Sequence, residues 1–387
     1  MYQAKTKVLI LSGDLGDGHQ QAANALMETA KLVQPDAEVT IINFMELAHP
    51  YLHTFGRYLF VKGVKNFPSV YGYLYRKTRH SDTPSSVLKT FNLFSVGRLF
   101  KLLEELQPTV VASTFPLAAY AMSLLKSKGL TAVPTVTVIT DHTDHSYWVH
   151  PHTDQYIVGS EHVRTRLNRI GIMDSLISVT GIPVRPSFNQ TYERENLREK
   201  YDLHPFLPTV LIMGGGYGII DKGISSLLKS DKFTEQMQFI IVCGRNDKLR
   251  QQLIAEAEHS KHRIVVTGFV DHIYEIMALA DLIITKPGGL TTSEALTLGI
   301  PMLLYKPLAG QEQDNAAFLL EAGAAMQAVD AVDLQIKCSE LIRQPKLLFM
   351  MKQNAKRIRS VNSAYQAVEV MLQTAQMLTD QMEYSHA

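Results

Sequence analysis

Short apolar runs rich in β-branched residues recur along the chain, and each is followed by a stretch with helical spacing. The run at 7–12 precedes a helical pattern near 18–33, and the run at 109–114 precedes one at 116–127. Continuous apolar strands are typical of parallel sheets that helices cover on both faces. The alternation therefore predicts an α/β protein. The other strands predicted in this first series are 38–44, 135–140, 155–160 and 178–184.

A second series of the same kind starts beyond the stretch 183–190. The two series predict two Rossmann-like domains, residues 1–187 and 188–348, that face each other across a cleft. The tail at 349–387 has the spacing of one or two helices, and we expect it to cross back to the first domain. Ligands of such sheets bind beyond the carboxyl ends of the strands, so we expect the chemistry in the turns there. The strands predicted in the second series are 209–216, 238–244, 263–270, 281–289 and 301–307.

Composition narrows the class of protein. Of the 387 residues, 46% are apolar and 19% are charged, which is the balance of a folded protein. The net charge of +1 argues against a chain-wide field for nucleic acid, and the two cysteines, Cys243 and Cys338, exclude a disulfide scaffold. No signal-peptide pattern opens the chain, and the uncharged stretch 106–125 divides at Pro116 into a strand and a helix. We therefore expect a protein of the cytosol or of a membrane surface.

The first predicted strand ends in a glycine-rich turn, GDLGDGH at 13–19. Its spacing differs from the GxGxxG of dinucleotide sites, which disfavours a nicotinamide enzyme. Glycines let a backbone approach a ligand closely or turn tightly, and His19 follows the last of them at the start of a helix. Because imidazole titrates near neutrality, His19 is a candidate general base. A polar residue that only opens the helix has the same pattern.

Two glycine-rich turns of the second series are typical of phosphate sites. The run GGG at 214–216 follows one strand, and a Pro-Gly-Gly turn at 287–289 leads from another strand into a helix. Backbone N–H groups at such turns and helix starts bind anions. The alternative for 214–216 is a loop selected for flexibility. Glu294 lies one turn into the helix and can accept hydrogen bonds from two ribose hydroxyls, but Thr291 and Glu294 also match a capping box.

Two polar stretches follow other predicted strands. The stretch 310–315 offers amide and carboxylate groups that suit sugar hydroxyls, or it only opens a helix. The stretch 140–152 holds four of the fourteen histidines and the one tryptophan. We expect it to line an acceptor site, with Asp141 or His145 assisting proton transfer. A plain surface loop and a metal site are the alternatives.

Residues 57–101 are basic and aromatic. They hold nine Lys or Arg against one acid, Asp82, and nine of the 32 aromatic residues of the chain. Basic residues beside aromatic rings favour an anionic lipid surface, although single-stranded nucleic acid is bound by the same residue types. A helix pair with a solvated basic face is a third interpretation. We expect lipid as the partner and no nucleic acid.

Together these motifs resemble the monogalactosyldiacylglycerol-synthase-type glycosyltransferases, and most of all the bacterial processive diacylglycerol β-glucosyltransferases. The resemblance covers nearly the whole chain, and it rests on the order and spacing of six segments. The long basic-aromatic insertion separates the chain from the peptidoglycan-precursor transferase of the same fold. The six segments are VLILSGDLGDGH at 8–19, TDHTDHSYWVHP at 140–151, VTGIPVRP at 179–186, GGGYG at 214–218, TKPGGLTTSEAL at 285–296 and YKPLAGQEQDNA at 305–316.

The resemblance implies a GT-B fold and an inverting, metal-independent transfer of a hexose, with glucose favoured, from a UDP-sugar to diacylglycerol. It implies no cofactor, and a peripheral place on the cytosolic side of the membrane. His19 would take the acceptor proton, Glu294 would bind the ribose, and Gln311 and Glu312 would hold the hexose. The other residues expected to hold the donor, mainly at its diphosphate, are Gly18, Arg185, Gly214, Gly215, Gly216, Gly288, Gly289, Thr291, Thr292 and Asn315.

Two other functions fit the same motifs. A UDP-N-acetylglucosamine 2-epimerase-like enzyme would share the fold and the UDP site but need no lipid surface. A non-catalytic UDP-sugar sensor would dock on a membrane or on a protein and would turn over no sugar nucleotide.

Overall fold

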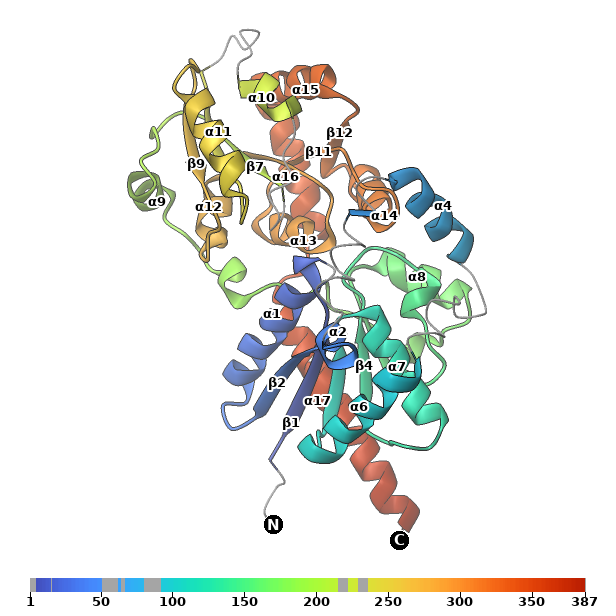
Figure 1. The fold of residues 1–387 in the computed structure, drawn as a ribbon. Helices are drawn as coiled ribbons and strands as arrows, with labels where there is room; N and C mark the ends of the chain where they lie inside the picture. The colour runs from blue at the N-terminus through green and yellow to red at the C-terminus, as the bar shows by residue number, and fades with distance from the viewer. Residues whose placement is uncertain are drawn as a thin grey trace. The chain divides into compact units, whose positions relative to one another are not determined.

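The computed structural model describes residues 5–14, 16–50, 62–63, 67–79, 92–214, 222–228 and 236–386. The chain forms two compact units, each built on one six-stranded parallel sheet (Figure 1). The predicted α/β class with two Rossmann-like domains is therefore confirmed. Unit 1 comprises Met1–Pro186, Ala309–Gln311 and Asn362–Ala387, and unit 2 comprises Ser187–Leu308 and Glu312–Val361.

The sheet of unit 1 has the strand order β2-β1-β3-β4-β5-β6, and every neighbouring pair is parallel. In the register of β1, Val8 pairs with Val39 on one side and with Val110 on the other. Successive residues of a strand point to opposite faces of the sheet, as Leu9 and Ile10 of β1 do. Both are buried because helices cover both faces. The strands are β1 (Lys7–Ser12), β2 (Glu38–Asn43), β3 (Val110–Ser113), β4 (Thr135–Val138), β5 (Gln155–Val158) and β6 (Ile177–Val179).

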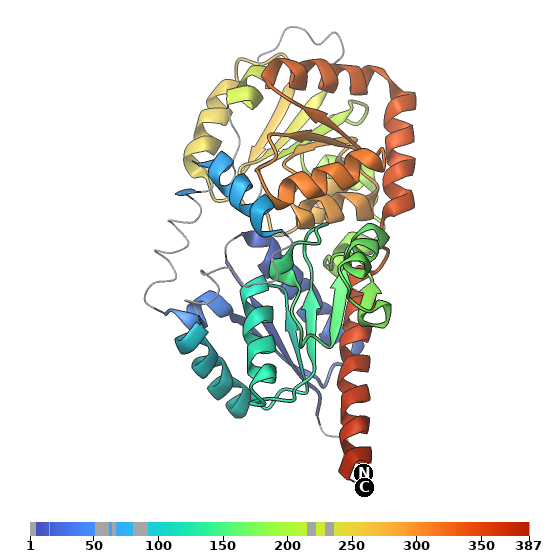
Figure 2. The same cartoon turned by 90° about the vertical axis from the view of Figure 1, so that its right-hand side faces the viewer.

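The last helix of the chain, α17 (Ser363–His386), completes unit 1. Figure 2 shows it as one long helix beside the sheet. Its Val368 and Met371 lie in one buried cluster with Val8 and Ile10 of β1. The other helices of unit 1 are α1 (Asp17–Val33), α2 (Phe44–Ala48), α4 (Pro68–Thr78), α6 (Asn92–Leu106), α7 (Pro116–Ser127) and α8 (Glu161–Arg169), with short 3₁₀ turns at Ser146–Trp148 and Asp174–Leu176.

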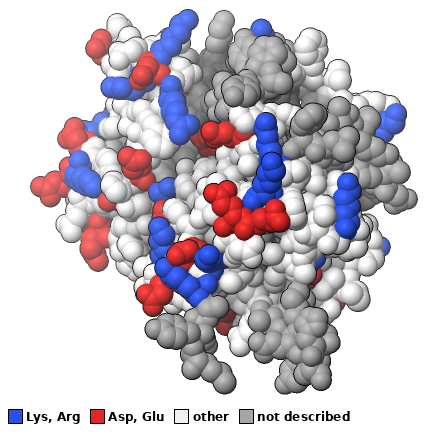
Figure 3. Space-filling model, turned by 60° about the horizontal axis from the view of Figure 1, so that its bottom comes forward, with Lys and Arg blue, Asp and Glu red and all other residues white. Residues whose placement is uncertain are grey.

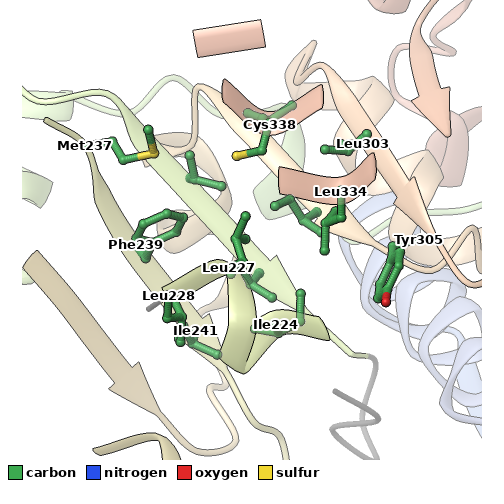
Figure 4. Packing of buried hydrophobic residues seen from close by; sticks show 14 of the residues in the cluster. Ile224, Leu227, Leu228, Met237, Phe239, Ile241, Leu303, Tyr305, Leu334 and Cys338 are labelled. Carbon is green, nitrogen blue, oxygen red and sulfur yellow. The ribbon is translucent and has the colours of Figure 1, made fainter. Parts of the chain in front are cut away.

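The sheet of unit 2 has the order β12-β11-β10-β7-β8-β9, again all parallel. Figure 4 shows a buried cluster of this unit, in which Phe239 and Ile241 pack near Leu227 and Leu228. Both cysteines are buried there as free thiols. The strands are β7 (Thr209–Met213), β8 (Gln238–Val242), β9 (Arg263–Thr267), β10 (Leu282–Thr285), β11 (Met302–Tyr305) and β12 (Ala325–Ala328).

The helices of unit 2 alternate with these strands, and two more follow β12. The chain leaves unit 1 after Pro186, next to the predicted boundary at 187. Apart from the short stretch Ala309–Gln311, it returns to unit 1 at Asn362, later than the predicted 349, because Met351 is buried in the core of unit 2. The helices are α9 (Arg194–Lys200), α10 (Lys222–Leu228), α11 (Asp247–Ala257), α12 (Ile273–Leu279), α13 (Gly289–Leu298), α14 (Gln311–Glu321), α15 (Ala331–Arg343) and α16 (Pro345–Ile358), and a 3₁₀ turn at Pro186–Asn189 precedes them.

The surface carries charges of both signs. On the face drawn in Figure 3, Lys and Arg side chains lie among Asp and Glu side chains, in keeping with the net charge of +1. Among the helices of the described residues, none combines the length and the apolar character needed to cross a bilayer.

Candidate active site

His19 lies in the first turn of α1, just beyond the end of β1. Thr114 Oγ1 donates a hydrogen bond to its main-chain oxygen at 3.1 Å, which ties the helix start to the end of β3. On the side chain, Nδ1 lies 3.0 Å from Thr140 Oγ1. Phe115 and Trp148 contact the ring with centroid distances of 5.3 and 6.0 Å. The structure thus brings the glycine-rich turn and the histidine-rich stretch of unit 1 together around one imidazole.

Gly13 makes room for this arrangement. A Cβ at position 13 would lie 2.6 Å from the ring of Phe115, far inside the distance at which carbon atoms attract. Phe115 in turn borders His19. The first glycine of the turn is therefore explained by packing, whereas Gly18 is the second residue of α1.

The protonation state of His19 suits a base. Burial lowers its pKa to about 4, and a main-chain hydrogen bond at Thr114 offsets part of that effect. The side chain is nevertheless only half-buried. At pH 7 the imidazole is therefore neutral and has a lone pair for a proton, as general base catalysis requires.

The loop after β4 is buried and internally bonded. Asp141 and Asp144 are both more than nine-tenths buried. Asp144 accepts a hydrogen bond from Arg79 Nε at 2.9 Å, and Arg166 lies 3.7 Å away. Burial raises the pKa of Asp144, but the hydrogen bond and charge of Arg79 outweigh it, so the pKa is lowered and the carboxylate stays ionised. Burial is the main cause that raises the pKa of Tyr147, and the charge of Asp141 raises it further.

His145 contacts α4 through its ring. Its Nε2 lies 2.9 Å from the main-chain oxygen of Tyr75 and 3.3 Å from Thr78 Oγ1. Its Nδ1 accepts a hydrogen bond from the N–H of Tyr147 at 3.2 Å, so the ring proton belongs on Nε2. These are the contacts of a residue that holds α4 against the loop. The catalytic part predicted for Asp141 or His145 stays a prediction.

A second histidine of this loop, His142, is also engaged. Its Nδ1 lies 3.2 Å from Ser160 Oγ, and burial lowers its pKa to about 3. Within the described ranges, no three His, Cys, Asp or Glu side chains are grouped so that they could hold a metal ion. The predicted metal independence stays a prediction.

In unit 2, α13 begins at the Pro-Gly-Gly turn after β10. Its N-cap is Gly288, which has no side chain to cap the helix. Thr292 Oγ1 donates to the main-chain oxygen of Gly288 at 2.9 Å, and Ser293 Oγ donates to that of Gly289 at 2.7 Å. Both hydroxyls therefore bond carbonyl groups and leave the first-turn N–H groups to a ligand. The capping-box alternative is wrong, because Thr291 lies inside the helix and Gly288 is the N-cap.

Three more of the predicted donor residues are held in the same region of unit 2. Glu294 is buried in α13. Asn315 is fully buried, and its Nδ2 donates to the main-chain oxygen of Pro287 at 3.0 Å, which braces the turn before α13. Glu312 accepts a hydrogen bond from Leu308 N at 2.6 Å. Burial raises the pKa of Glu312, and the Leu308 N–H and the charge of Lys286 offset part of the effect.

Two predicted donor residues are placed in unit 1. Gln311 clusters with unit 1, where its amide oxygen accepts a hydrogen bond from Tyr71 at 2.9 Å. Arg185, in unit 1, is half-buried, with its Nε 3.4 Å from a carboxylate oxygen of Glu28. Gly214 is buried at the end of β7. Gly215 and Gly216 lie outside the described residues.

Comparison with known proteins identifies the family. Residues 19–184 match the model for monogalactosyldiacylglycerol synthase, and residues 209–371 match the glycosyltransferase family 28 C-terminal domain. The chain is 32% identical over 376 residues to the processive diacylglycerol β-glucosyltransferase of Bacillus subtilis, with 96% of each chain covered. The chain belongs to the monogalactosyldiacylglycerol-synthase-type glycosyltransferase family. The enzyme of the same name from Bacillus pumilus is 31% identical to this glycosyltransferase, with 98% of each covered.

Solved structures support the GT-B fold of the glycosyltransferase. The MurG protein of Acinetobacter baumannii is 17% identical and aligns with a TM-score of 0.58 over 96% of this chain and 100% of its own. The UDP-GlcNAc 2-epimerase of Neisseria meningitidis is also 17% identical, with a TM-score of 0.61 and the same coverage. The predicted family, the GT-B class and the hexosyltransferase class are confirmed. The family also places the glycosyltransferase in glycolipid synthesis.

One pocket of the glycosyltransferase was missed by reasoning from the sequence. It has a volume of about 540 Å³ and lies at the carboxyl ends of β8 and β9 in unit 2. The guanidinium carbon of Arg245 is 4.9 Å from the centre of the Phe269 ring. Each of these strand ends has one glycine, so a search for glycine runs passes over them. The rule that ligands bind beyond the carboxyl ends of the strands, applied to every strand, would have found the pocket. Its lining includes Gly244, Arg245, Arg250, Thr267, Gly268 and Phe269.

The described part of the basic-aromatic segment is residues 62–63, α4 with its flanking residues 67 and 79, and the start of α6 at 92–101. The outer face of α4 exposes four apolar side chains, with exposed fractions from 51% to 65%. The opposite face is anchored, because Tyr75 Oη lies 2.8 Å from Thr143 Oγ1 and Ser146 Oγ donates to the Thr78 main chain at 2.7 Å. Arg57, Lys65 and Lys89 lie outside the described residues. The exposed residues, called here the α4 stripe, are Phe67, Val70, Tyr73 and Leu74.

Proposed function

We propose that this glycosyltransferase moves a hexose, glucose in preference to galactose, from a UDP-sugar to the hydroxyl of diacylglycerol, with inversion at the anomeric carbon and with no metal ion or other cofactor. We also propose that it repeats the transfer on its own product. The observation that carries the proposal is the half-buried, neutral imidazole of His19 beyond the end of β1. Membership of the family supports the acceptor class, because the relatives at 31–32% identity are diacylglycerol β-glucosyltransferases.

At the acceptor, His19 removes one proton. The diacylglycerol oxygen forms a bond to the anomeric carbon while its proton passes to the imidazole. The bond from that carbon to the diphosphate oxygen breaks on the opposite face, and its electron pair leaves with UDP. One base aligned behind the acceptor oxygen is enough for an inverting displacement, and a neutral His19 meets this need.

At the donor, the leaving diphosphate needs positive charge. The uncapped N-terminus of α13 offers free N–H groups and the helix dipole, which act without reorganisation. Arg185 adds a guanidinium, and the glycines at 214–216 add main-chain N–H groups. Glu294 binds the ribose hydroxyls, and Gln311 and Glu312 hold the hexose. The pocket beside Phe269 suits a planar nucleobase, because a ring and a guanidinium line it.

At the lipid, the α4 stripe enters the apolar edge of an anionic membrane. Arg76 and Lys77 at the end of α4 are exposed, and Lys62 is exposed as well. Each basic side chain near an anionic surface contributes about 1 kcal/mol, and apolar side chains add burial in the interface. The glycosyltransferase would thus bind the cytosolic side of the membrane peripherally and reach diacylglycerol there.

A radiolabel assay tests the proposal. Purified protein is incubated with labelled UDP-glucose or UDP-galactose and anionic vesicles that contain diacylglycerol, and the lipids are then separated. We expect label in glycolipid with the wild type, and a ladder of products if transfer repeats. His19→Ala should lose a factor of about 10²–10⁴ in rate if His19 is a general base. His259→Ala, which changes an exposed histidine of unit 2, is the control and should keep full activity.

Other outcomes identify the alternatives. Epimerised sugar nucleotide without labelled lipid would indicate an epimerase-like enzyme. Bound but unchanged UDP-sugar would indicate a sensor. Full lipid labelling by His19→Ala would overturn the role of His19 while leaving the substrates intact.

A further inference from the structure

Two groups hydrogen-bond the ring of His19: the main chain at Thr114 and, among the described side chains, Thr140. The Oγ1 of Thr140 lies 3.0 Å from Nδ1. Thr140 is only 4% exposed and follows β4 by two residues, so its hydroxyl is buried close to the end of that strand. A hydroxyl is uncharged, so it fixes a ring nitrogen without adding the negative charge of a carboxylate.

The contacts on the ring edges restrict its rotation. Phe115 meets the ring at an interplanar angle of 68° and Trp148 at 61°, so both pack edge-on against it. Phe115 and Trp148 are themselves buried, with exposed fractions of 3% and 0%. A turn of the imidazole about its own axis would therefore displace two packed side chains as well as break the bond to Thr140.

A neutral imidazole carries its proton on one nitrogen only, and the other nitrogen is then the base. If Nδ1 carries the proton and donates it to Thr140, the lone pair lies on Nε2. If Nδ1 accepts from the threonine hydroxyl, the lone pair is consumed and Nε2 carries the proton. Only the first arrangement leaves a basic nitrogen for an acceptor hydroxyl.

We propose that Thr140 is a positioning residue of this glycosyltransferase: its hydroxyl oxygen accepts a hydrogen bond from Nδ1–H of His19 and so keeps the basic lone pair on Nε2. This inference rests on the proposed function, in which His19 is the base. When Nε2 receives the acceptor proton, the ring becomes an imidazolium, and the same bond to Thr140 stabilises its Nδ1–H. Thr140 touches neither substrate nor reacting atom.

Two substitutions separate this role from a structural one. Thr140→Val removes the hydroxyl at nearly the same volume, and Thr140→Ser keeps it. We expect Thr140→Val to lower kcat by about 10- to 100-fold, the cost of a misplaced catalytic group, with little change in KM for the UDP-sugar. Thr140→Ser should stay within about threefold of the wild type. In a His19→Ala background, Thr140→Val should cause no further loss, because the group that it positions is gone.

A spectroscopic readout tests the tautomer without any turnover. Histidine labelled with ¹⁵N reports which ring nitrogen carries hydrogen, and His19→Ala identifies the signals of His19. We expect Nδ1–H in the wild type at pH 7, and a loss of that preference in Thr140→Val. Nε2–H in the wild type, or an unchanged rate in Thr140→Val, would overturn the inference. A wild type that makes no glycolipid would instead refute the proposed function, whatever the tautomer.

Discussion

Three histidines of unit 1 have strongly lowered pKa values, and burial is the main cause for each. The pKa is about 4 for His19, about 3 for His142 and about 4 for His150. His142 and His150 are buried, with exposed fractions of 1% and 6%, whereas His19 is half-buried. Of these three, His19 alone combines a neutral ring at pH 7 with access for a substrate. Exposure, more than the pKa, therefore distinguishes the candidate base from the two structural histidines.

The lowered pKa of His19 predicts an unusual pH profile. A base stays active above its own pKa, so kcat/KM should fall only as the pH drops through about 4, and not near 6.5 as for an ordinary histidine. We expect kcat/KM for the UDP-sugar to be flat from about pH 5.5 to about pH 8. The measurement is an initial-rate series over this range.

Acid unfolding must be separated from titration of the base. Because the three folded pKa values lie below 6.5, the unfolded chain binds more protons at acid pH. Their contribution to stability is thus complete above about pH 6.5 and is lost as the pH falls towards 4. Enzyme held at each pH and returned to pH 7.5 should recover its rate. An inflection near pH 6.5 with full recovery would contradict the lowered pKa of the base.

At the scale of one element, α4 has two faces with different partners. The inner face bonds to the loop after β4 through Tyr75, Thr78 and Arg79. The outer face exposes the α4 stripe. Because these bonds hold the inner face, a change on the outer face should alter lipid binding and leave the fold intact.

The α4 stripe predicts the effect of two charged substitutions on vesicle binding. Val70→Glu with Leu74→Glu places two anions on the outer face, and we expect affinity for anionic vesicles to fall by at least about tenfold, since each lost apolar contact costs about 1–2 kcal/mol. Val332→Glu with Ile336→Glu is the matched control on α15, where the exposed fractions are 55% and 56% against 56% and 51%. Vesicle co-sedimentation measures both pairs. Equal losses, or none, would refute the role of the stripe.

Many of the helices and strands could be predicted from the sequence. The strand at 7–12 and the helix near 18–33 follow from local spacing, and α1 begins within one residue of the prediction. The strand β12 was missed, because AMQA at 325–328 has no β-branched residue. The bond between His145 and Tyr75 joins residues 70 positions apart, and local pattern holds no information on such pairs. The sequence could therefore predict which strand ends form the site, but not the hydrogen bonds that join its residues.

At the scale of the whole molecule, both ends of the chain belong to unit 1. The sheet of this unit forms from the first half of the sequence, yet part of its core comes from the last helix, α17. Met371 is 1% exposed in a cluster with Val8 and Ile10, whereas Met377 on the same helix is 63% exposed. The core of unit 1 is therefore complete only after nearly all of the chain has been made.

This dependence predicts different effects for two methionines of one helix. Met371→Ala should destabilise unit 1 by about 2–5 kcal/mol, the usual cost of removing a buried methionine side chain. Met377→Ala should change stability by less than about 0.5 kcal/mol. The one tryptophan of the sequence, Trp148, is buried in unit 1, so its fluorescence during urea unfolding reports this unit separately from unit 2. We expect the midpoint to fall by about 1 M or more for Met371→Ala only. Equal midpoints for the two variants would mean that unit 1 unfolds independently of α17.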